Sequence, residues 1–213
     1  MVFDDRTDAG ERLADLLERR GVEADLVLAI PRGGLPVGRA VADRLGVPLD
    51  VVVAEKLGAP GNPELAIGAV AGDGSVWVND ELVDHLGVSS AYVERVRESE
   101  AENAREKVAS YRGGEAVPEL AGRRVVLVDD GIATGATAIA CLRQIRSAGA
   151  AHLTLAVPVA PRDAESRLGG EFDAFVCVES PRWFGAVGQY YRSFGQVSNE
   201  EARAILESYE PNG

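Results

Sequence analysis

The sequence predicts an α/β protein built on a parallel sheet, and three observations support this fold class. Short apolar runs rich in Val, Leu and Ile recur along the 213 residues, as expected for strands buried on both faces. Segments with helical spacing separate these runs, and such alternation is typical of a parallel sheet. Glycines follow the helical segments, where they suit helix C-termini.

Five apolar runs are candidate strands of this sheet: residues 26–30, 51–54, 125–128, 153–159 and 174–178. We expect a helix ahead of the first run, because Asp8 and Glu11 have capping-box spacing and leucines follow at helical spacing up to Gly21. Further helices are expected at residues 36–45 and 137–148, and a closing helix at about 199–209.

A long insertion separates the second run from the third. Its Gly/Pro-rich residues 58–63 form a loop that we interpret as a mobile lid. Residues 66–71 have an alternating pattern and, with a turn at residues 72–74 before residues 75–78, predict a β-hairpin beside the main sheet. Residues 89–112 predict a charged helix, for which a solvated surface is favoured over a partner-binding face.

Composition narrows the classes of partner. With 22 basic against 34 acidic residues the formal net charge is −12, which disfavours nucleic acid and anionic membranes as partners. Any bound phosphate should therefore be a small one, held locally. We expect a cytoplasmic protein, because no apolar run reaches the ~18–20 residues of a membrane span and the first residues are acidic. Cys141 and Cys177 lack metal-site spacing and indicate core residues.

One stretch carries the chemistry. It reads Val125-Val126-Leu127-Val128-Asp129-Asp130-Gly131-Ile132-Ala133-Thr134-Gly135-Ala136-Thr137. A buried strand ends in two carboxylates, and a loop of small residues then opens a helix whose N–H groups suit a dianionic phosphate, with Thr134 and Thr137 as further donors. Asp129 and Asp130 would repel that phosphate, so they suit a sugar's hydroxyls or a nearby cation. The pattern predicts a ribose 5-phosphate pocket.

Three other interpretations fit less well. A nucleoside-triphosphate P-loop needs a lysine where Ala136 stands. A dinucleotide-binding loop needs a glycine spacing that Gly131 and Gly135 do not have. A plain strand-to-helix turn would leave two adjacent acids at a buried strand end without a partner, which is costly.

Residues 125–138 resemble the phosphoribosyl-pyrophosphate (PRPP) signature of type I phosphoribosyltransferases, in the variant of the adenine-type enzymes. The resemblance implies the type I fold: a central parallel sheet flanked by helices, a small hairpin insertion and a C-terminal hood at about residues 180–197. We expect one domain over residues 1–213. The implied reaction is Mg²⁺-dependent transfer of the 5-phosphoribosyl group to an acceptor, expected to be a nucleobase or related nitrogen nucleophile, with release of pyrophosphate. Adenine-like, pyrimidine-like and non-nucleobase acceptors all remain open.

The resemblance also implies site residues. Asp129 and Asp130 would bind the ribose hydroxyls and assist catalysis, and loop residues 133–137 would hold the 5-phosphate. The ribose 5-phosphate site as a whole would comprise Asp129, Asp130, Gly131, Ile132, Ala133, Thr134, Gly135, Ala136 and Thr137. Mg²⁺ would be held by PRPP itself, with the two aspartates contributing through water and no direct protein ligand.

A second loop occupies the place of the family's pyrophosphate loop: Ile30-Pro31-Arg32-Gly33-Gly34. Arg32 can fork two phosphate oxygens, and Gly33 and Gly34 allow close backbone approach to an anion. Lys56, which follows the second run, is a further candidate pyrophosphate contact in a chain with only two lysines. An ordinary tight turn and a solvated charge remain the alternatives. Residues 56–69 resemble a poorly characterised subgroup of predicted phosphoribosyltransferases, although Glu55 stands where a basic residue is expected.

The sequence says least about the residues that would bind the acceptor. Ala133 stands where hypoxanthine-guanine enzymes carry an acid, which disfavours that kind of purine recognition. Glu64 is the candidate general base, and Trp183 and Phe184 in the hood are candidates to stack on an acceptor, to pack the hood, or to face another subunit. A homodimer is expected. The rival function is a PRPP- or nucleotide-binding regulatory protein without transfer chemistry.

Overall fold

The core of the computed structural model is a five-stranded sheet, and the structure describes residues 2–113 and 118–208. Its strands are β1 (Leu26–Ala29), β2 (Leu49–Val51), β6 (Arg124–Val128), β7 (His152–Val159) and β8 (Ala174–Glu179). They lie in the order β2-β1-β6-β7-β8, and every pairing is parallel. The predicted central parallel sheet is confirmed.

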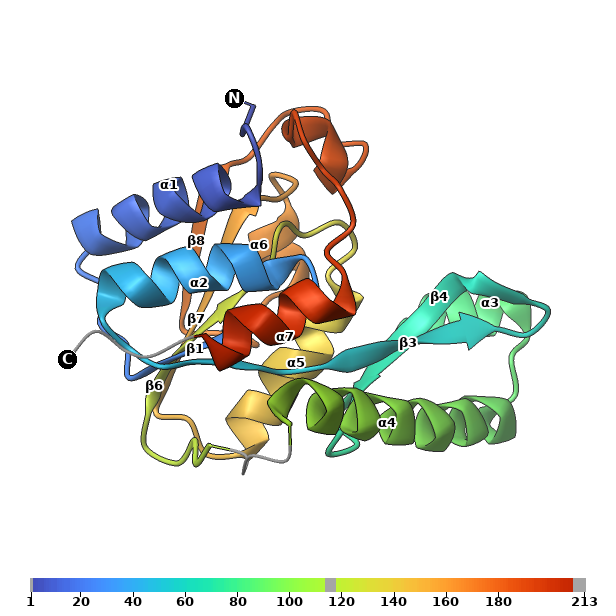
Figure 1. Ribbon diagram of the computed structural model, residues 1–213. Helices are drawn as coiled ribbons and strands as arrows, with labels where there is room; N and C mark the ends of the chain where they lie inside the picture. Colours follow the sequence, from blue (N-terminus) through green and yellow to red (C-terminus); the bar gives the residue numbers. More distant parts are fainter. Residues whose placement is uncertain (1, 114–117, 209–213) are drawn as a thin grey trace.

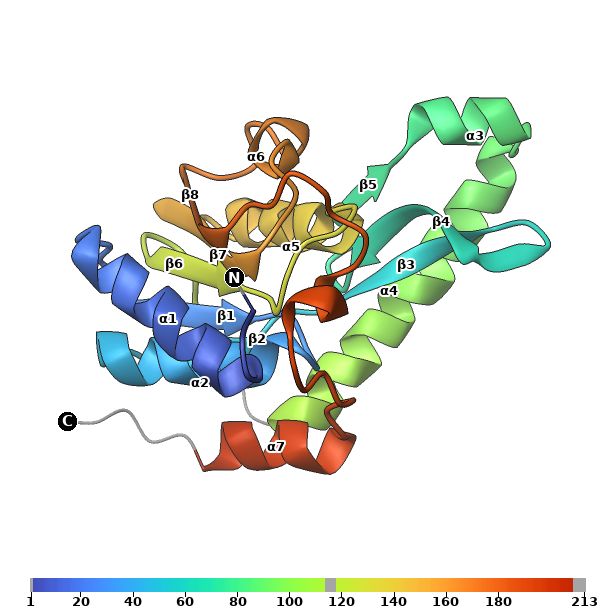
Figure 2. The same ribbon diagram turned by 90° about the horizontal axis from the view of Figure 1, so that it is seen from above.

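Helices cover both faces of this sheet (Figure 2). On one face lie α1 (Arg6–Arg19) and α2 (Gly34–Leu45), with α7 (Asn199–Glu207) beside α2. On the other lie α5 (Ala136–Ser147) and the short α6 (Ala164–Arg167). Successive residues of β1 alternate between the two cores: Val27 packs with α1 and α2, and Leu28 packs with α5. Both faces are buried, which explains why the strands are continuous apolar runs.

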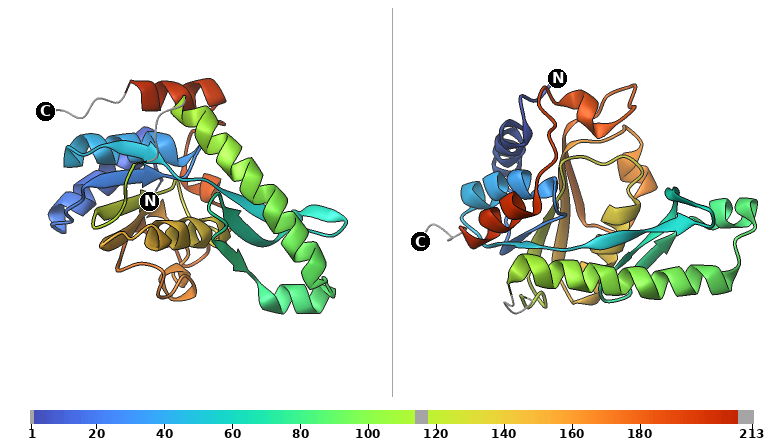
Figure 3. Two further views of the ribbon diagram at one scale, coloured as in Figure 1. Left: turned by 90° about the horizontal axis from the view of Figure 1, so that it is seen from below. Right: turned by 45° about the vertical axis from the view of Figure 1, so that its right-hand side comes forward.

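An arm, residues 54–112, projects from this core (Figure 1). It holds an antiparallel sheet of β3 (Ala54–Ala59), β4 (Asn62–Ala71) and β5 (Val76–Val78), followed by α3 (Asp80–Leu86) and α4 (Ser90–Arg112). Helix α4 runs from the far end of the arm back to the core (Figure 3). Its residues Tyr92 and Val96 pack on buried Leu57 and Ile67 of the arm sheet, so much of its apolar side is covered by its own chain.

The hood follows β8 and contains a short 3-10 turn, η1 (Val187–Tyr190). It lies against the N-terminal segment, where Phe3 and Tyr191 form an isolated parallel bridge. The predicted closing helix is confirmed over 199–207, while residue 209 falls outside the described residues. In residues 2–113 and 118–208, no helix combines the length and apolarity that crossing a membrane requires.

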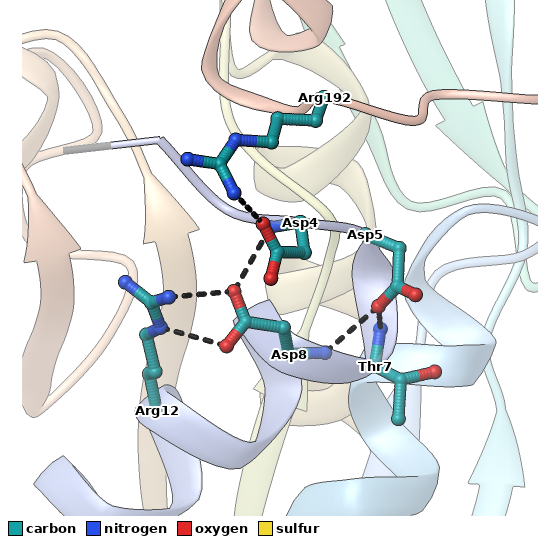
Figure 4. Close-up of polar contacts among 6 residues, drawn as sticks. All are labelled: Asp4, Asp5, Thr7, Asp8, Arg12 and Arg192. Atoms are coloured by element: carbon teal, nitrogen blue, oxygen red, sulfur yellow. Dashed lines mark hydrogen bonds and ion pairs between the residues drawn. The ribbon is translucent and has the colours of Figure 1, made fainter.

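Three local predictions were wrong. Helix α1 begins at Arg6, earlier than the predicted capping box, because the Asp5 carboxylate accepts from the backbone N–H groups of Thr7 and Asp8. Aspartate is itself a preferred N-cap, and Asp8 inside the first turn pairs with Arg12 instead (Figure 4). The other two errors concern the arm.

The predicted strand 51–54 spans two sheets, since β2 ends at Val51 and Ala54 begins β3. An apolar run does not reveal where the chain leaves one sheet for another. The predicted loop 58–63 is the turn of the β3–β4 hairpin, with Ala59 paired to Asn62. The predicted hairpin of residues 66–71 and 75–78 is confirmed as the antiparallel β4–β5 pair, and β3 adds a third strand to it.

Candidate active site

A cavity of about 500 Å³ opens at the C-terminal ends of β1 and β6. Open parallel sheets generally bind ligands at this edge. All nine residues of the predicted ribose 5-phosphate site, 129–137, line it. Gly33, Lys56, Glu55 and Lys107 line it as well.

We call residues 129–137 the loop wall of this cavity. Its last three residues include Gly135, the N-cap of α5, so no side chain caps the N-terminus of this helix. The first N–H groups of a helix have no intrahelical acceptor, so this end of the wall suits an anion. Gly135 has φ +86°, a conformation that side-chain-bearing residues rarely adopt. These backbone features of the loop wall are compatible with the predicted phosphate site, which stays a prediction.

The two carboxylates differ in their partners. Asp129 Oδ1 accepts from the Asp130 N–H over 2.8 Å, and Asp130 Oδ2 accepts from Arg6 Nε over 2.8 Å. Burial and the neighbouring Asp130 charge raise the pKa of Asp129 well above its ordinary value. Burial also raises the pKa of Asp130, and the Arg6 guanidinium partly offsets that rise. Arg6 thus supplies the cation that makes an adjacent pair of partly buried acids tolerable.

Gly33 is required by the close approach of Asp130. A Cβ at Gly33 would lie 2.0 Å from Asp130 Oδ2 and 3.3 Å from Arg6 Nε. Gly34 meets the same strand end, since its Cβ would lie 3.1 Å from Asp129 Cα. In this structure the two glycines bring the second loop against the carboxylates; whether they also approach an anion stays a prediction.

A second group of lining residues, Glu55, Lys56 and Lys107, comes from the arm, and we call it the arm wall. Glu55 and Lys56 lie on β3, and Lys107 reaches the cavity from α4. Lys107 Nζ lies 2.6 Å from Glu55 Oε1. Lys56 belongs to the arm sheet and does not end a core strand as expected. The arm wall brings both lysines of the chain to one cavity.

Sequence reasoning missed Arg6 and Lys107. Arg6 lies 124 positions from its partner Asp130, and no local pattern marks it. Lys107 carried one signal, its rarity, because the chain has only two lysines. Tyr191 was also missed; its hydroxyl donates to the Asp130 carbonyl over 2.5 Å, and burial raises its pKa.

Several predicted residues lie outside the lining of the cavity. Arg32 follows a cis peptide bond after Pro31, and its Nη1 lies 3.4 Å from Asn199 Oδ1. Glu64 is exposed on β4. In the hood, Phe184 stacks on Tyr190 and Trp183 is 90% exposed. Neither is placed against the loop wall, so their predicted roles stay predictions.

Comparison with known proteins assigns the chain to a family. A family model described as phosphoribosyl transferase domain matches residues 69–194. The chain belongs to this phosphoribosyl transferase domain family. The match includes the loop wall and Lys107, and it begins beyond Arg6, Gly33 and Lys56. The resemblance to phosphoribosyltransferases is confirmed.

Two Mycobacterium tuberculosis relatives, named putative phosphoribosyl transferase Rv0571c (strain H37Rv) and MT0597 (strain CDC 1551), are 44% identical over 206 residues. That is 97% of this chain and 46% of each relative, so the chain spans about half the length of these curated relatives.

Among solved structures, TT1426 from Thermus thermophilus is 42% identical, with a TM-score of 0.81 over 97% of this chain and 98% of that one. A hypothetical protein from Neisseria gonorrhoeae with bound ppGpp has a TM-score of 0.54 over 98% of both chains. At 15% identity the second likeness concerns the fold alone.

Proposed function

We propose that this protein transfers the 5-phosphoribosyl group of PRPP to a nitrogen acceptor with release of pyrophosphate. The observation that carries the proposal is the composition of one cavity: an uncapped helix start, two carboxylates and two lysines face the same space. PRPP offers a 5-phosphate, ribose hydroxyls and a pyrophosphate, and these groups need complementary partners of those three kinds. In the reaction the bond from ribose C1 to pyrophosphate breaks, C1 bonds to nitrogen, and the acceptor loses a proton.

The loop wall would hold the 5-phosphate and the ribose. The N–H groups at the start of α5, with Thr134 and Thr137, would donate to the phosphate. Asp129 and Asp130 would accept from the ribose hydroxyls, since each has one described oxygen contact and a carboxylate can accept several hydrogen bonds. Ionised carboxylates there would also stabilise positive charge that develops on the ribose as pyrophosphate leaves.

The arm wall would hold the pyrophosphate. Lys56 and Lys107 are the cations that line the cavity within the described residues. Lys107 would exchange Glu55 for a pyrophosphate oxygen, because a dianionic group attracts an ammonium more strongly than one carboxylate does. Arg32 would then contribute less than its place in the second loop suggests, since it lies against Asn199.

Mg²⁺ would enter this site bound to oxygens of the substrate. Within residues 2–113 and 118–208 no group of three His, Cys, Asp or Glu side chains is arranged to hold a metal ion. Oxygens of PRPP would therefore supply most of the coordination, with Asp129 and Asp130 contributing through water. When bound, Mg²⁺ would neutralise charge on the departing pyrophosphate.

The acceptor would enter beneath the hood, where Trp183 and Phe184 remain our candidates for stacking. Glu64 would need movement of the β3–β4 hairpin to reach the cavity. A homodimer could alternatively cover the exposed Trp183 ring.

The test is a pyrophosphate-release assay with PRPP, Mg²⁺ and a panel of purine and pyrimidine bases. We expect release with at least one base, and a larger loss of turnover than of PRPP affinity in Asp129→Asn and Asp130→Asn, because charge on the ribose grows in the transition state. Binding of PRPP without release for any base would favour the regulatory rival. No binding of PRPP would end the proposal.

A further inference from the structure

Arg6 joins helix α1, the hood and the candidate ribose site through three contacts. Its Nε donates to Asp130 Oδ2 over 2.8 Å, and its Nη1 donates to the carbonyl oxygen of Gly195 over 2.6 Å. Its guanidinium carbon lies 3.9 Å from the centroid of the Phe194 ring. The Arg6 and Asp130 side chains are only 12% and 14% exposed, so water competes little for this pair.

The hood is fastened to the same N-terminal segment by its backbone. The Phe3 N–H donates to the Tyr190 carbonyl over 2.7 Å, and the Arg192 N–H donates to the Phe3 carbonyl over 2.8 Å. An exposed ion pair between Arg192 and Asp4 adds a side-chain contact (Figure 4). The hood thus meets Asp130 from two sides, at its carbonyl through Tyr191 and at its carboxylate through Arg6.

We propose that Arg6 is a positioning residue that couples docking of the hood to ligand binding at Asp130. The proposal rests on the proposed function in taking Asp130 as a ribose-binding group. A guanidinium is planar and donates in fixed directions, so one conformation of Arg6 serves Asp130 and Gly195 together. When the hood moves away from α1, Gly195 and Phe194 no longer hold Arg6, and Arg6 is free to move. Asp130 then loses both the partner that orients its carboxylate and the charge that balances it.

The coupling must act in both directions. A sugar phosphate that binds to Asp130 favours the arrangement in which Arg6 is held and the hood is docked. Equally, a substitution in the hood that loosens Arg6 must weaken sugar-phosphate binding, although the substituted residue does not line the cavity. A purely local ion pair between Arg6 and Asp130 would not have this second property.

The binding experiment uses the full chain, ribose 5-phosphate with Mg²⁺ as the probe, and calorimetry. We expect Arg6→Gln to weaken binding about tenfold, the scale of one lost charge-assisted contact. Phe194→Ala removes the ring beneath the guanidinium and should weaken binding about threefold. Arg192→Gln is the matched control: it also removes a contact between the hood and the N-terminal segment, but none of its described contacts reaches Asp130, so affinity should stay unchanged.

Hydrogen exchange supplies a readout that a merely structural role would not move. At saturating ribose 5-phosphate we expect slower exchange of amides 187–195 in the wild type. Arg6→Lys keeps the charge but loses the fork, so its hood should gain no protection when the ligand binds. This variant and Phe194→Ala carry the test if Arg6→Gln does not fold.

Two results would overturn the coupling while leaving the proposed function in place. One is wild-type affinity in Phe194→Ala, even if Arg6→Gln binds more weakly, because the Arg6–Asp130 pair would then act locally. The other is hood exchange that is unchanged by ligand in the wild type. If the wild type binds neither PRPP nor ribose 5-phosphate, the proposed function fails and this inference fails with it, so the wild type alone distinguishes the two cases.

Discussion

The two walls of the cavity are built in different ways. The loop wall is one contiguous segment between β6 and α5, so elements at both of its ends hold its backbone. The arm wall is assembled from β3 and α4, which are far apart in the sequence, and it presents charged side chains. From this difference we expect the loop wall to bind a phosphate mainly through its backbone shape and the arm wall to bind an anion mainly through its lysines. Substitutions should therefore alter folding and binding together at the first wall, and binding alone at the second.

The largest effect is expected for Gly135→Val in the loop wall. The new Cβ would lie 2.5 Å from Leu168 Cδ2, at a φ of +86°. We expect a loss of about 3 kcal/mol of unfolding free energy, because collision and backbone strain add. The sequence alone predicts that the same change affects only the phosphate cradle, with little loss of fold.

Gly74→Val in the arm is the matched control, since Gly74 has φ +90° and open space around its Cβ. Backbone strain alone should cost it about 1 kcal/mol. Urea unfolding measures both variants. Equal losses would mean that the Leu168 contact relaxes freely and that the loop wall is less rigid than we argue.

Lys107→Ala tests the arm wall and should be next in size. We expect pyrophosphate to bind about tenfold more weakly, on the order of 1.4 kcal/mol, with ribose 5-phosphate affinity and thermal stability unchanged. Arg97→Ala is the control on the same helix, because Arg97 also pairs with a glutamate, Glu94, and does not line the cavity. Calorimetry in the presence of Mg²⁺ measures the affinities of both variants for pyrophosphate and ribose 5-phosphate. Equal weakening of both ligands would show that Lys107 acts through the general field of the protein.

Asp129→Asn should produce a smaller effect that depends on pH. Burial and Asp130 raise the folded-state pKa of Asp129, so its ionisation is disfavoured by folding. The wild type consequently loses stability as pH rises from about 4, the unfolded-state pKa, through the folded-state value. The variant avoids this loss, and its melting temperature should exceed that of the wild type by about 2–4 °C at neutral pH, with no gain below pH 4.

Asp173→Asn should change the thermal stability at neutral pH in the opposite direction to Asp129→Asn. Burial of Asp173 raises its pKa, but the Leu153 N–H and Arg146 together outweigh that effect, and the pKa is lowered. Its stabilising contribution is present above about pH 4 and is lost as pH falls through the folded-state pKa, so the variant should be less stable at neutral pH. Thermal unfolding across pH 3–8 compares the two variants. If the melting temperatures of the two variants changed with pH in the same way, the two carboxylates would not differ in environment as we argue.

Arg32→Ala should have the smallest effect, below about threefold on pyrophosphate affinity, because its guanidinium lies against Asn199. A loss as large as that of Lys107→Ala would show that Arg32 turns into the cavity when pyrophosphate binds. The second loop would then share the role that we give to the arm wall.

Local pattern predicted the elements whose environment is uniform along the chain. The strands 125–128 and 153–159 were found almost to the residue, since burial on both faces leaves a continuous apolar run. The start of α1 was missed because Asp5 and Asp8 are both acceptable caps, and only the tertiary position of the N-terminal segment selects one. The passage from β2 to β3 was missed because Val52 and Val53 are apolar in either sheet.

The sequence by itself determined the loop wall, because a strand end, two acids, a small-residue loop and a helix start are consecutive residues whose geometry follows from local rules. Only the tertiary structure decided which side chains complete the site. Arg6 meets Asp130 because α1 packs beside α2, and Lys107 meets Glu55 because α4 returns beneath the arm. Such pairings depend on distances across the fold, and these distances cannot be read from the positions of the charged residues along the sequence.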